Sequence, residues 1–190
     1  MLSVVRKAFT LMETLVALLL VVTMAAIILP VVVTKISTVN SSVLSGNLRA
    51  INQAILRYRE DVGRYPRLLS QLTTRPTVGV SVDACGTAMN STTVASWNGP
   101  YLSLSVGTSG IQSGDAIIAN NLQRNPLTTS NSTIMNGVLQ LSAGSVTGAN
   151  ASDAESVFDT GNDLDHGTIT WIPTSGIIGT LTFSIPVRGC

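Results

Sequence analysis

An uncharged, apolar run near the N-terminus constrains this chain more than any other feature. No Lys, Arg, Asp or Glu occurs between Glu13 and Lys35, and only one threonine and one proline interrupt the apolar side chains of 15–33. A helix of the 21 uncharged residues 14–34 would be roughly 31 Å long, which matches the hydrocarbon thickness of a bilayer. The run therefore predicts a helix that spans a membrane.

The flanking charges predict the orientation of this span. Arg6 and Lys7 precede it, and basic residues beside a span tend to stay on the cytoplasmic side. Lys35 can extend its ammonium group to the opposite interface. We therefore expect a cytoplasmic N-terminus and a translocated remainder of the chain.

Three other interpretations of the run are possible. The apolar stretch exceeds the 7–15 residues of a cleaved signal peptide, although small residues at Ala25 and Ala26 offer a cleavage site. A simple signal anchor fits the length but gives no reason for an acid at Glu13. A buried core helix of this length would require a larger domain around it than the chain can supply.

Glu13 is the residue that needs an explanation. A carboxylate near the bilayer centre costs about 2.5–3.5 kcal/mol on insertion scales. The run contains no cation, and Arg6 and Lys7 are seven and six positions away, where the headgroups attract them. A counter-charge from another molecule would remove this cost.

The segment RKAFTLME, residues 6–13, resembles the class III signal of type IV pilins and type II secretion pseudopilins. This resemblance implies that prepilin peptidase cuts between Ala8 and Phe9 and methylates the new Phe9 amine. It also implies that Glu13 pairs with the Phe9 amine of a neighbouring subunit in a filament. Ala8 stands where the family usually has glycine. Pro30 lies where the family has a proline inside its helix, and a proline there predicts a kink or local melting.

Helical spacing continues beyond the apolar run. Gly63 is a suitable C-terminal cap and Pro66 prevents continuation, so we expect one helix over 9–62, about 80 Å long. Apolar residues recur at intervals of three and four on one face of its second half. They are Val39, Val43, Leu44, Leu48, Ile51, Ile55, Tyr58 and Val62.

Two further segments resemble the major pseudopilin of type II secretion systems. YREDVGRYP at 58–66 is similar to the family's Tyr-x-x-Asp-x-Gly-x-Tyr-Pro, and WNGPYL at 97–102 is similar to its Trp-x-Gly-Pro-Tyr-Leu. Read from the residues alone, Gly63 and Pro66 end the helix, and Gly99-Pro100 makes a turn.

The C-terminal part has the pattern of a β-rich domain. Residues 180–187 alternate polar and apolar side chains, 168–172 form a similar run, and 137–146 are a third candidate strand. Residues 173–179 can connect the first two as a hairpin, whereas 73–96 and 107–132 are expected to be surface loops with short strands. The expected fold is α+β and pilin-like, with a long N-terminal α-helix packed on a C-terminal antiparallel sheet. Its parts are a leader (1–8), a transmembrane half-helix (9–35), an amphipathic half-helix (36–66) and a head (67–190).

Cys85 and Cys190 are the only cysteines. Outside the cytoplasm they are expected to form a disulfide, which would close a loop of roughly 105 residues and restrict the unfolded chain by about 4–5 kcal/mol. Unpaired thiols, or an intermolecular bond through Cys190, are the alternatives.

Acidic residues gather at 153–165, where Asp159, Asp163 and Asp165 could supply oxygen ligands to Ca²⁺. A solvated loop is the alternative, because the spacing does not match an EF-hand. The Asp-Pro-Trp-Gly-like calcium loop of major pseudopilins does not occur, and Asn125-Pro126 is the nearest approach to it. Calcium is the one cofactor that we consider.

Composition and motifs argue against an enzyme and against nucleic-acid binding. Charged residues make up 11% of the chain and the formal net charge is +1, so no basic surface is expected to attract nucleic acid. His166 is the one histidine, and no nucleophile elbow, phosphate loop or zinc spacing accompanies it.

We therefore expect a structural subunit of a type IV pilus-like filament, most closely a pseudopilin of a type II secretion system. The resemblance implies an inner-membrane protein with a periplasmic head that assembles into a homo-oligomeric filament. Its implied partners are other pseudopilins or pilins, prepilin peptidase and the inner-membrane assembly platform, and it is stored in the membrane before assembly. The alternatives are a major or minor type IV pilin and, from another class, a monomeric signal-anchored envelope protein that binds a ligand.

Overall fold

The chain has an α+β fold in which a long N-terminal helix precedes a five-stranded antiparallel sheet. This computed structural model describes residues 11–126, 136–159, 164 and 167–188, and leaves out the side chains of 30–39, 125–126, 136–137 and 188. The chain divides into two compact units, Met1–Thr38 and Val39–Cys190. Helix α1 (Leu11–Val62) contributes residues to both.

In the first unit, the described part of α1 is apolar and exposed. Residues Leu11–Leu29 are long and apolar enough to cross a membrane, and none of this segment is buried. The Thr14 and Thr23 hydroxyls donate to the carbonyls of Leu11 and Leu20 at 2.8 and 2.9 Å, so both polar groups are satisfied within the helix. The helix is assigned without a break at Pro30, so the expected local melting is not seen, and a kink there stays a prediction.

In the second unit, α1 buries the predicted apolar stripe. Six of its eight residues are buried, namely Leu44, Leu48, Ile51, Ile55, Tyr58 and Val62. The prediction is wrong for Val43, whose side chain is 39% exposed, and the Val39 side chain lies outside the described residues. The helix ends as expected: Gly63 has a φ of +75°, and its N–H donates to the Arg59 carbonyl at 2.8 Å.

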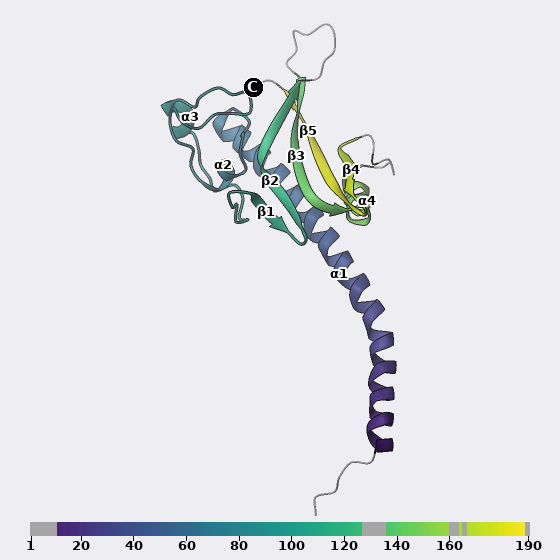
Figure 1. Ribbon diagram of the computed structural model, residues 1–190. Coiled ribbons are helices and arrows are strands. Elements are labelled where there is room, and N and C mark those ends of the chain that lie inside the picture. The colour runs from purple at the N-terminus through teal and green to yellow at the C-terminus, as the bar shows by residue number, and fades with distance from the viewer. Residues whose placement is uncertain (1–10, 127–135, 160–163, 165–166, 189–190) are drawn as a thin grey trace, which may run out of the picture. The chain divides into compact units, whose positions relative to one another are not determined.

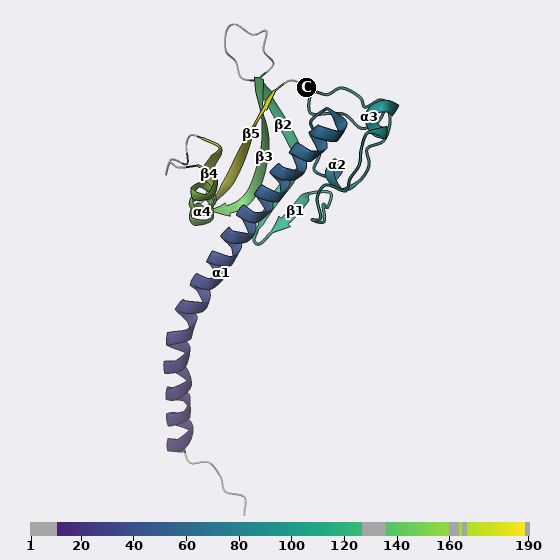
Figure 2. The ribbon, with the colours of Figure 1, turned by 180° about the vertical axis from the view of Figure 1, so that it is seen from behind.

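The sheet occupies the rest of the second unit (Figures 1 and 2). Its strand order is β1-β2-β3-β5-β4, and every neighbouring pair is antiparallel. The strands are β1 (Gly110–Ser113), β2 (Ala116–Pro126), β3 (Asn136–Thr147), β4 (Ile169–Ser175) and β5 (Ile178–Arg188). In the register, Phe183 of β5 is paired with Leu141 of β3 and with Ile169 of β4.

The sequence prediction is confirmed for β3, β4 and β5. The turn that joins β4 to β5 is shorter than the expected connection over 173–179. For 107–126 the sequence predicted surface loops with short strands; the four-residue β1 is such a strand, whereas the eleven-residue β2 is longer than predicted. The sequence prediction missed α4 (Gly148–Phe158), which begins with the Thr147 hydroxyl accepting the Asn150 N–H at 3.3 Å. The buried residues of α4 are two alanines, Ala151 and Ala154, and two polar residues, Asn150 and Glu155, so its apolar pattern is weak.

Two short helices, α2 (Ser70–Thr73) and α3 (Ser91–Ala95), lie in the connection between α1 and the sheet. Just before α2, the chain runs beside the part of β2 that is not paired with β1. The Leu122 N–H donates to the Arg67 carbonyl, and the Leu69 N–H donates to the Asn120 carbonyl, both at 2.8 Å. The connection is thereby attached to the sheet.

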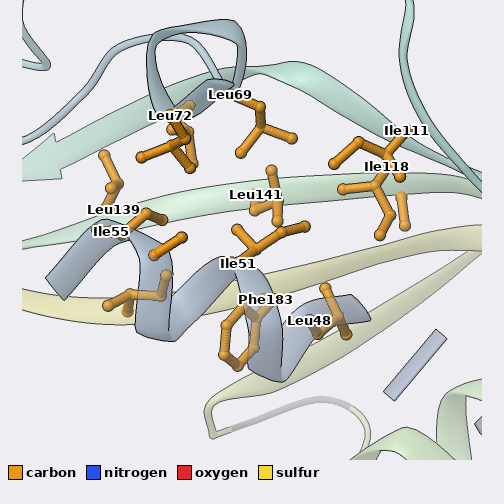
Figure 3. Packing of buried hydrophobic residues seen from close by; sticks show 14 of the residues in the cluster. Leu48, Ile51, Ile55, Leu69, Leu72, Ile111, Ile118, Leu139, Leu141 and Phe183 are labelled. Atoms are coloured by element: carbon orange, nitrogen blue, oxygen red, sulfur yellow. The ribbon is translucent and has the colours of Figure 1, made fainter. Parts of the chain in front are cut away.

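The core lies between α1 and one face of the sheet. Figure 3 shows Leu48, Ile51 and Ile55 of α1 together with Leu139 and Leu141 of β3 and Phe183 of β5. Helix α4 packs on this same face, because the Phe158 and Phe183 rings lie 4.8 Å apart. One face of the sheet therefore covers the stripe of α1, as the sequence predicted.

Candidate functional site

The candidate assembly site lies at the N-terminus. Ala8 and Phe9 lie outside the described residues, and the Pro30 side chain is among those not described. Glu13 lies in the first turn of α1 with an exposed side chain. Glu13 is thus the acidic residue that opens a helix whose apolar side chains are exposed on all sides through Leu29.

The two segments with a pseudopilin-like sequence meet in space. The Tyr58 and Tyr101 rings form an edge contact with centroids 5.6 Å apart, and the Trp97 and Tyr101 rings form another at 5.6 Å. The Trp97 indole N–H donates to the Gln71 carbonyl at 2.9 Å. The aromatic residues of the second segment therefore pack against the last turns of α1.

Tyr101 also makes polar contacts with the end of α1. Its hydroxyl donates to the Asp61 carboxylate at 2.9 Å and accepts the Asn98 N–H at 2.8 Å. Burial raises the pKa of Tyr101 and the bond to Asp61 raises it further, while the Asn98 N–H opposes the shift. The hydroxyl therefore remains neutral, and remains a donor, throughout the physiological pH range.

Tyr58 is the most deeply buried aromatic residue of this group, with no exposed surface. Its hydroxyl lies 3.6 Å from the Met89 sulfur, a weak acceptor. Burial raises the pKa of Tyr58 strongly, and Tyr101 and Asp83 raise it further. This tyrosine is a neutral core residue that joins α1 to the connection following it.

Asp83 holds the turn after α2, and sequence reasoning missed it. Its side chain is 1% exposed and lies 2.5 Å from an Arg64 guanidinium nitrogen. Its other carboxylate oxygen accepts the N–H groups of Cys85 at 3.0 Å and Thr87 at 2.8 Å. A single acidic residue in a loop is not part of a repeating pattern. The sequence therefore does not distinguish the buried Asp83 from acidic residues that are exposed to solvent.

Cys85 belongs to the same turn and is disulfide-bonded. Cys190, the second of the two cysteines in the chain, lies outside the described residues. Because Cys85 follows Asp83 by two residues, the disulfide and the buried carboxylate constrain the same turn.

Asp159, one of the three candidate calcium ligands, has another role in the structure. One of its carboxylate oxygens accepts the N–H groups of Thr168 at 2.7 Å and Ile169 at 3.1 Å, which connects the end of α4 to the start of β4. Asp163 and Asp165, together with His166, lie outside the described residues. Across the described part of the chain, no group of three or more His, Cys, Asp or Glu residues could hold a metal ion.

Comparison of the chain with protein-family models, curated proteins and solved structures finds no match. The functional assignment therefore depends on the motifs at 6–13, 58–66 and 97–102 and on the geometry above. That geometry consists of an exposed apolar helix that begins with an acid and a folded unit whose α1 end is held by Tyr58, Tyr101 and Asp83.

Proposed function

We propose that this protein is a structural subunit of a type IV pilus-like filament, most closely a pseudopilin of a type II secretion system. Before assembly, residues 11–29 anchor the subunit in the inner membrane, with the second unit in the periplasm. During assembly, the apolar helices of many copies leave the bilayer and pack against one another. The fold of the second unit is, on this proposal, pilin-like.

The observation that carries the proposal is the helix segment Leu11–Leu29, which is apolar and exposed along its length and contains the acidic Glu13 in its first turn. A soluble protein does not leave so large an apolar surface in contact with water, so lipid or other protein must cover it. A bilayer covers it in a stored subunit, and the helices of neighbouring copies cover it in a filament.

The chemistry of assembly follows from the resemblance at 6–13. Prepilin peptidase cleavage after Ala8 would create a free amine on Phe9, four residues before Glu13. In the filament, this ammonium group of one subunit would lie against the Glu13 carboxylate of the next. An ion pair in a medium of low dielectric is favourable only when both partners are present, so the pairing sets the register between subunits.

The two pseudopilin-like segments support the choice of a secretion pseudopilin over a pilus pilin. Their aromatic residues pack together at the end of α1, where Tyr101 joins Trp97 and Tyr58. A pilus pilin remains the second candidate within the class, because its N-terminal segment has the same pattern. A monomeric signal-anchored binding protein is the candidate from another class, and it would need neither Phe9 nor Glu13.

The first test is the N-terminus of the mature protein. In a host that has prepilin peptidase, mass spectrometry should find a chain that begins at Phe9 and carries one added methyl group. An intact Met1, or a start beyond Ala26, would instead favour the monomeric envelope protein.

The second test reverses the charge at Glu13. E13K should abolish incorporation into filaments, because two cations would then face each other. The matched control is E60K, which makes the same change on the exposed surface near the other end of α1 and should assemble normally. Both variants should keep the far-UV circular dichroism of the parent. Normal filaments from E13K would refute the pairing.

A further inference from the structure

The hairpin between β4 and β5 exposes three large apolar side chains. Ile172, Ile177 and Ile178 are 65%, 77% and 42% exposed. The sequence has no charged residue from 167 to 187, although exposed edge strands such as β4 commonly carry charges that prevent association. Single exposed apolar residues are normal, but three in one uncharged hairpin form an apolar tip, here called the isoleucine tip.

The register places two members of the isoleucine tip on the same face of the sheet. Ile172 is paired with Thr180, which lies two positions after Ile178 in β5. Alternate residues of a strand face the same side, so Ile172 and Ile178 lie on the face opposite the buried Leu181 and Phe183. Ile177 lies in the turn itself, after Gly176 with its φ of +57°.

The antiparallel register also shows at which end of the sheet the tip lies. Ile178, near the turn, is paired with Thr147 at the end of β3, and Gly144 of β3 is paired with Ile117 at the start of β2. The turn between β4 and β5 therefore shares an end of the sheet with the turn between β1 and β2. Figures 1 and 2 both show the two turns at that end.

This end of the sheet is where α1 enters the second unit. Asp115, in the turn between β1 and β2, accepts a hydrogen bond from the Asn40 side chain at 2.6 Å. Ser113, which ends β1, accepts one from Asn47 at 3.1 Å. Asn40 follows Leu29, the last residue of the candidate span, by eleven positions, so a short length of chain tethers this end of the sheet to the span.

We propose that the isoleucine tip is a second membrane contact, which lies in the interface between headgroups and acyl chains while the subunit is stored in the bilayer. The partner is the phospholipid surface itself. Because no charged residue lies in 167–187, the contact depends on apolar burial and does not require anionic lipid. The contact would restrict the orientation of the second unit at the membrane before assembly.

A lipid surface fits this tip better than a second copy of the chain does. Three isoleucine side chains supply much less than the roughly 800 Å² per partner that a stable protein interface buries. Tethering by the span keeps the tip at a high effective concentration near the bilayer, so a small apolar contact is sufficient. The inference rests on the membrane anchoring of the proposed function and is independent of filament assembly.

The test introduces a tryptophan reporter into the full chain, reconstituted in phosphatidylcholine vesicles with or without brominated acyl chains. I177W puts the reporter in the tip. V80W is the matched control, because Val80 is 76% exposed in the connection between α2 and α3, and the parent chain supplies the signal of Trp97 and Trp171. Bromine should quench the added emission of I177W at least twofold more than that of V80W, and the I177W emission should be shifted to shorter wavelength.

Equal quenching of I177W and V80W in vesicles that retain the chain through alkaline extraction would overturn the proposal. So would unquenched I177W together with cross-links between tips of two copies, which would identify a second copy as the partner. Loss of the chain on alkaline extraction would refute the membrane anchor, and with it this inference. Filament assembly of E13K leaves the outcome of this test unchanged, so the two proposals fail separately.

Discussion

Removal of the Asp83 carboxylate tests how the turn after α2 is held. We expect D83A to destabilise the second unit considerably, because three donors converge on a side chain that is 1% exposed. Two are the backbone N–H groups of Cys85 and Thr87, and the third is the Arg64 guanidinium. The alanine leaves all three without this acceptor.

The magnitude follows from the burial of each donor. A hydrogen bond to a charged group contributes about 1.5–3 kcal/mol when it is lost from a buried site, so the two backbone bonds together predict a loss of about 3 kcal/mol for D83A. Arg64 is 34% exposed and can be rehydrated, so its ion pair adds no more than about 1 kcal/mol. R64A should therefore cost no more than about 1 kcal/mol, whereas D83A, which loses the ion pair and both backbone bonds, should cost about 3–4 kcal/mol.

The assay is urea unfolding of the full chain in a mild non-ionic detergent, followed by the fluorescence of Trp97 and Trp171, with the parent and R64A measured in parallel. D83N is the second control, since its amide oxygen can still accept both backbone N–H groups, and it should lose about 1–2 kcal/mol. An R64A variant as unstable as D83A would refute the reasoning, because the ion pair and not the backbone bonds would then hold the turn.

Two further predictions concern the core and its titration. I51A should lower the free energy of unfolding by about 3 kcal/mol in the same assay, because Ile51 is fully buried. V43A, at a 39% exposed position, should lower it by less than about 1 kcal/mol. Equal losses in the two variants would contradict the assigned buried face of α1. Above the ordinary tyrosine pKa of 10.0, the unfolded chain releases the Tyr58 proton while the folded chain retains it. The contribution of Tyr58 to the free energy of unfolding should therefore be fully present below pH 10 and fall as the pH rises above it. Y58F should reduce this fall by up to about 1.4 kcal/mol per pH unit, and parallel pH profiles for Y58F and the parent would count against the burial of the Tyr58 hydroxyl.

The sequence predicted the long helix and its buried face well because both have a strong local cause. Periodicity and burial agree at Leu44, Leu48 and Ile51, and Gly63 with its positive φ ends the helix where expected. Val43 follows the same spacing but lies at the margin of the contact with the sheet. An amphipathic pattern indicates the direction of a buried face and not its width.

The sequence did not predict β2 and α4 because their cause is tertiary. β2 pairs with β3 along much of its length, and its edge is joined by Arg67 and Leu69 from a distant segment, so the pairing compensates for a weak strand pattern. α4 buries Ala151 and Ala154, which are small enough to let it lie close to the sheet. Neither the partners nor the available space can be read from a local window.

The candidate site divides in the same way. Glu13 and the apolar residues that follow it can be identified from the sequence alone, because charge and hydrophobicity act on each residue without reference to a fold. The contact of Tyr101 with Asp61 and Tyr58, the burial of Asp83 and the position of the isoleucine tip depend on which segments the sheet brings together. Those distances between residues remote in the chain are set by packing and register, and only the tertiary structure decides them.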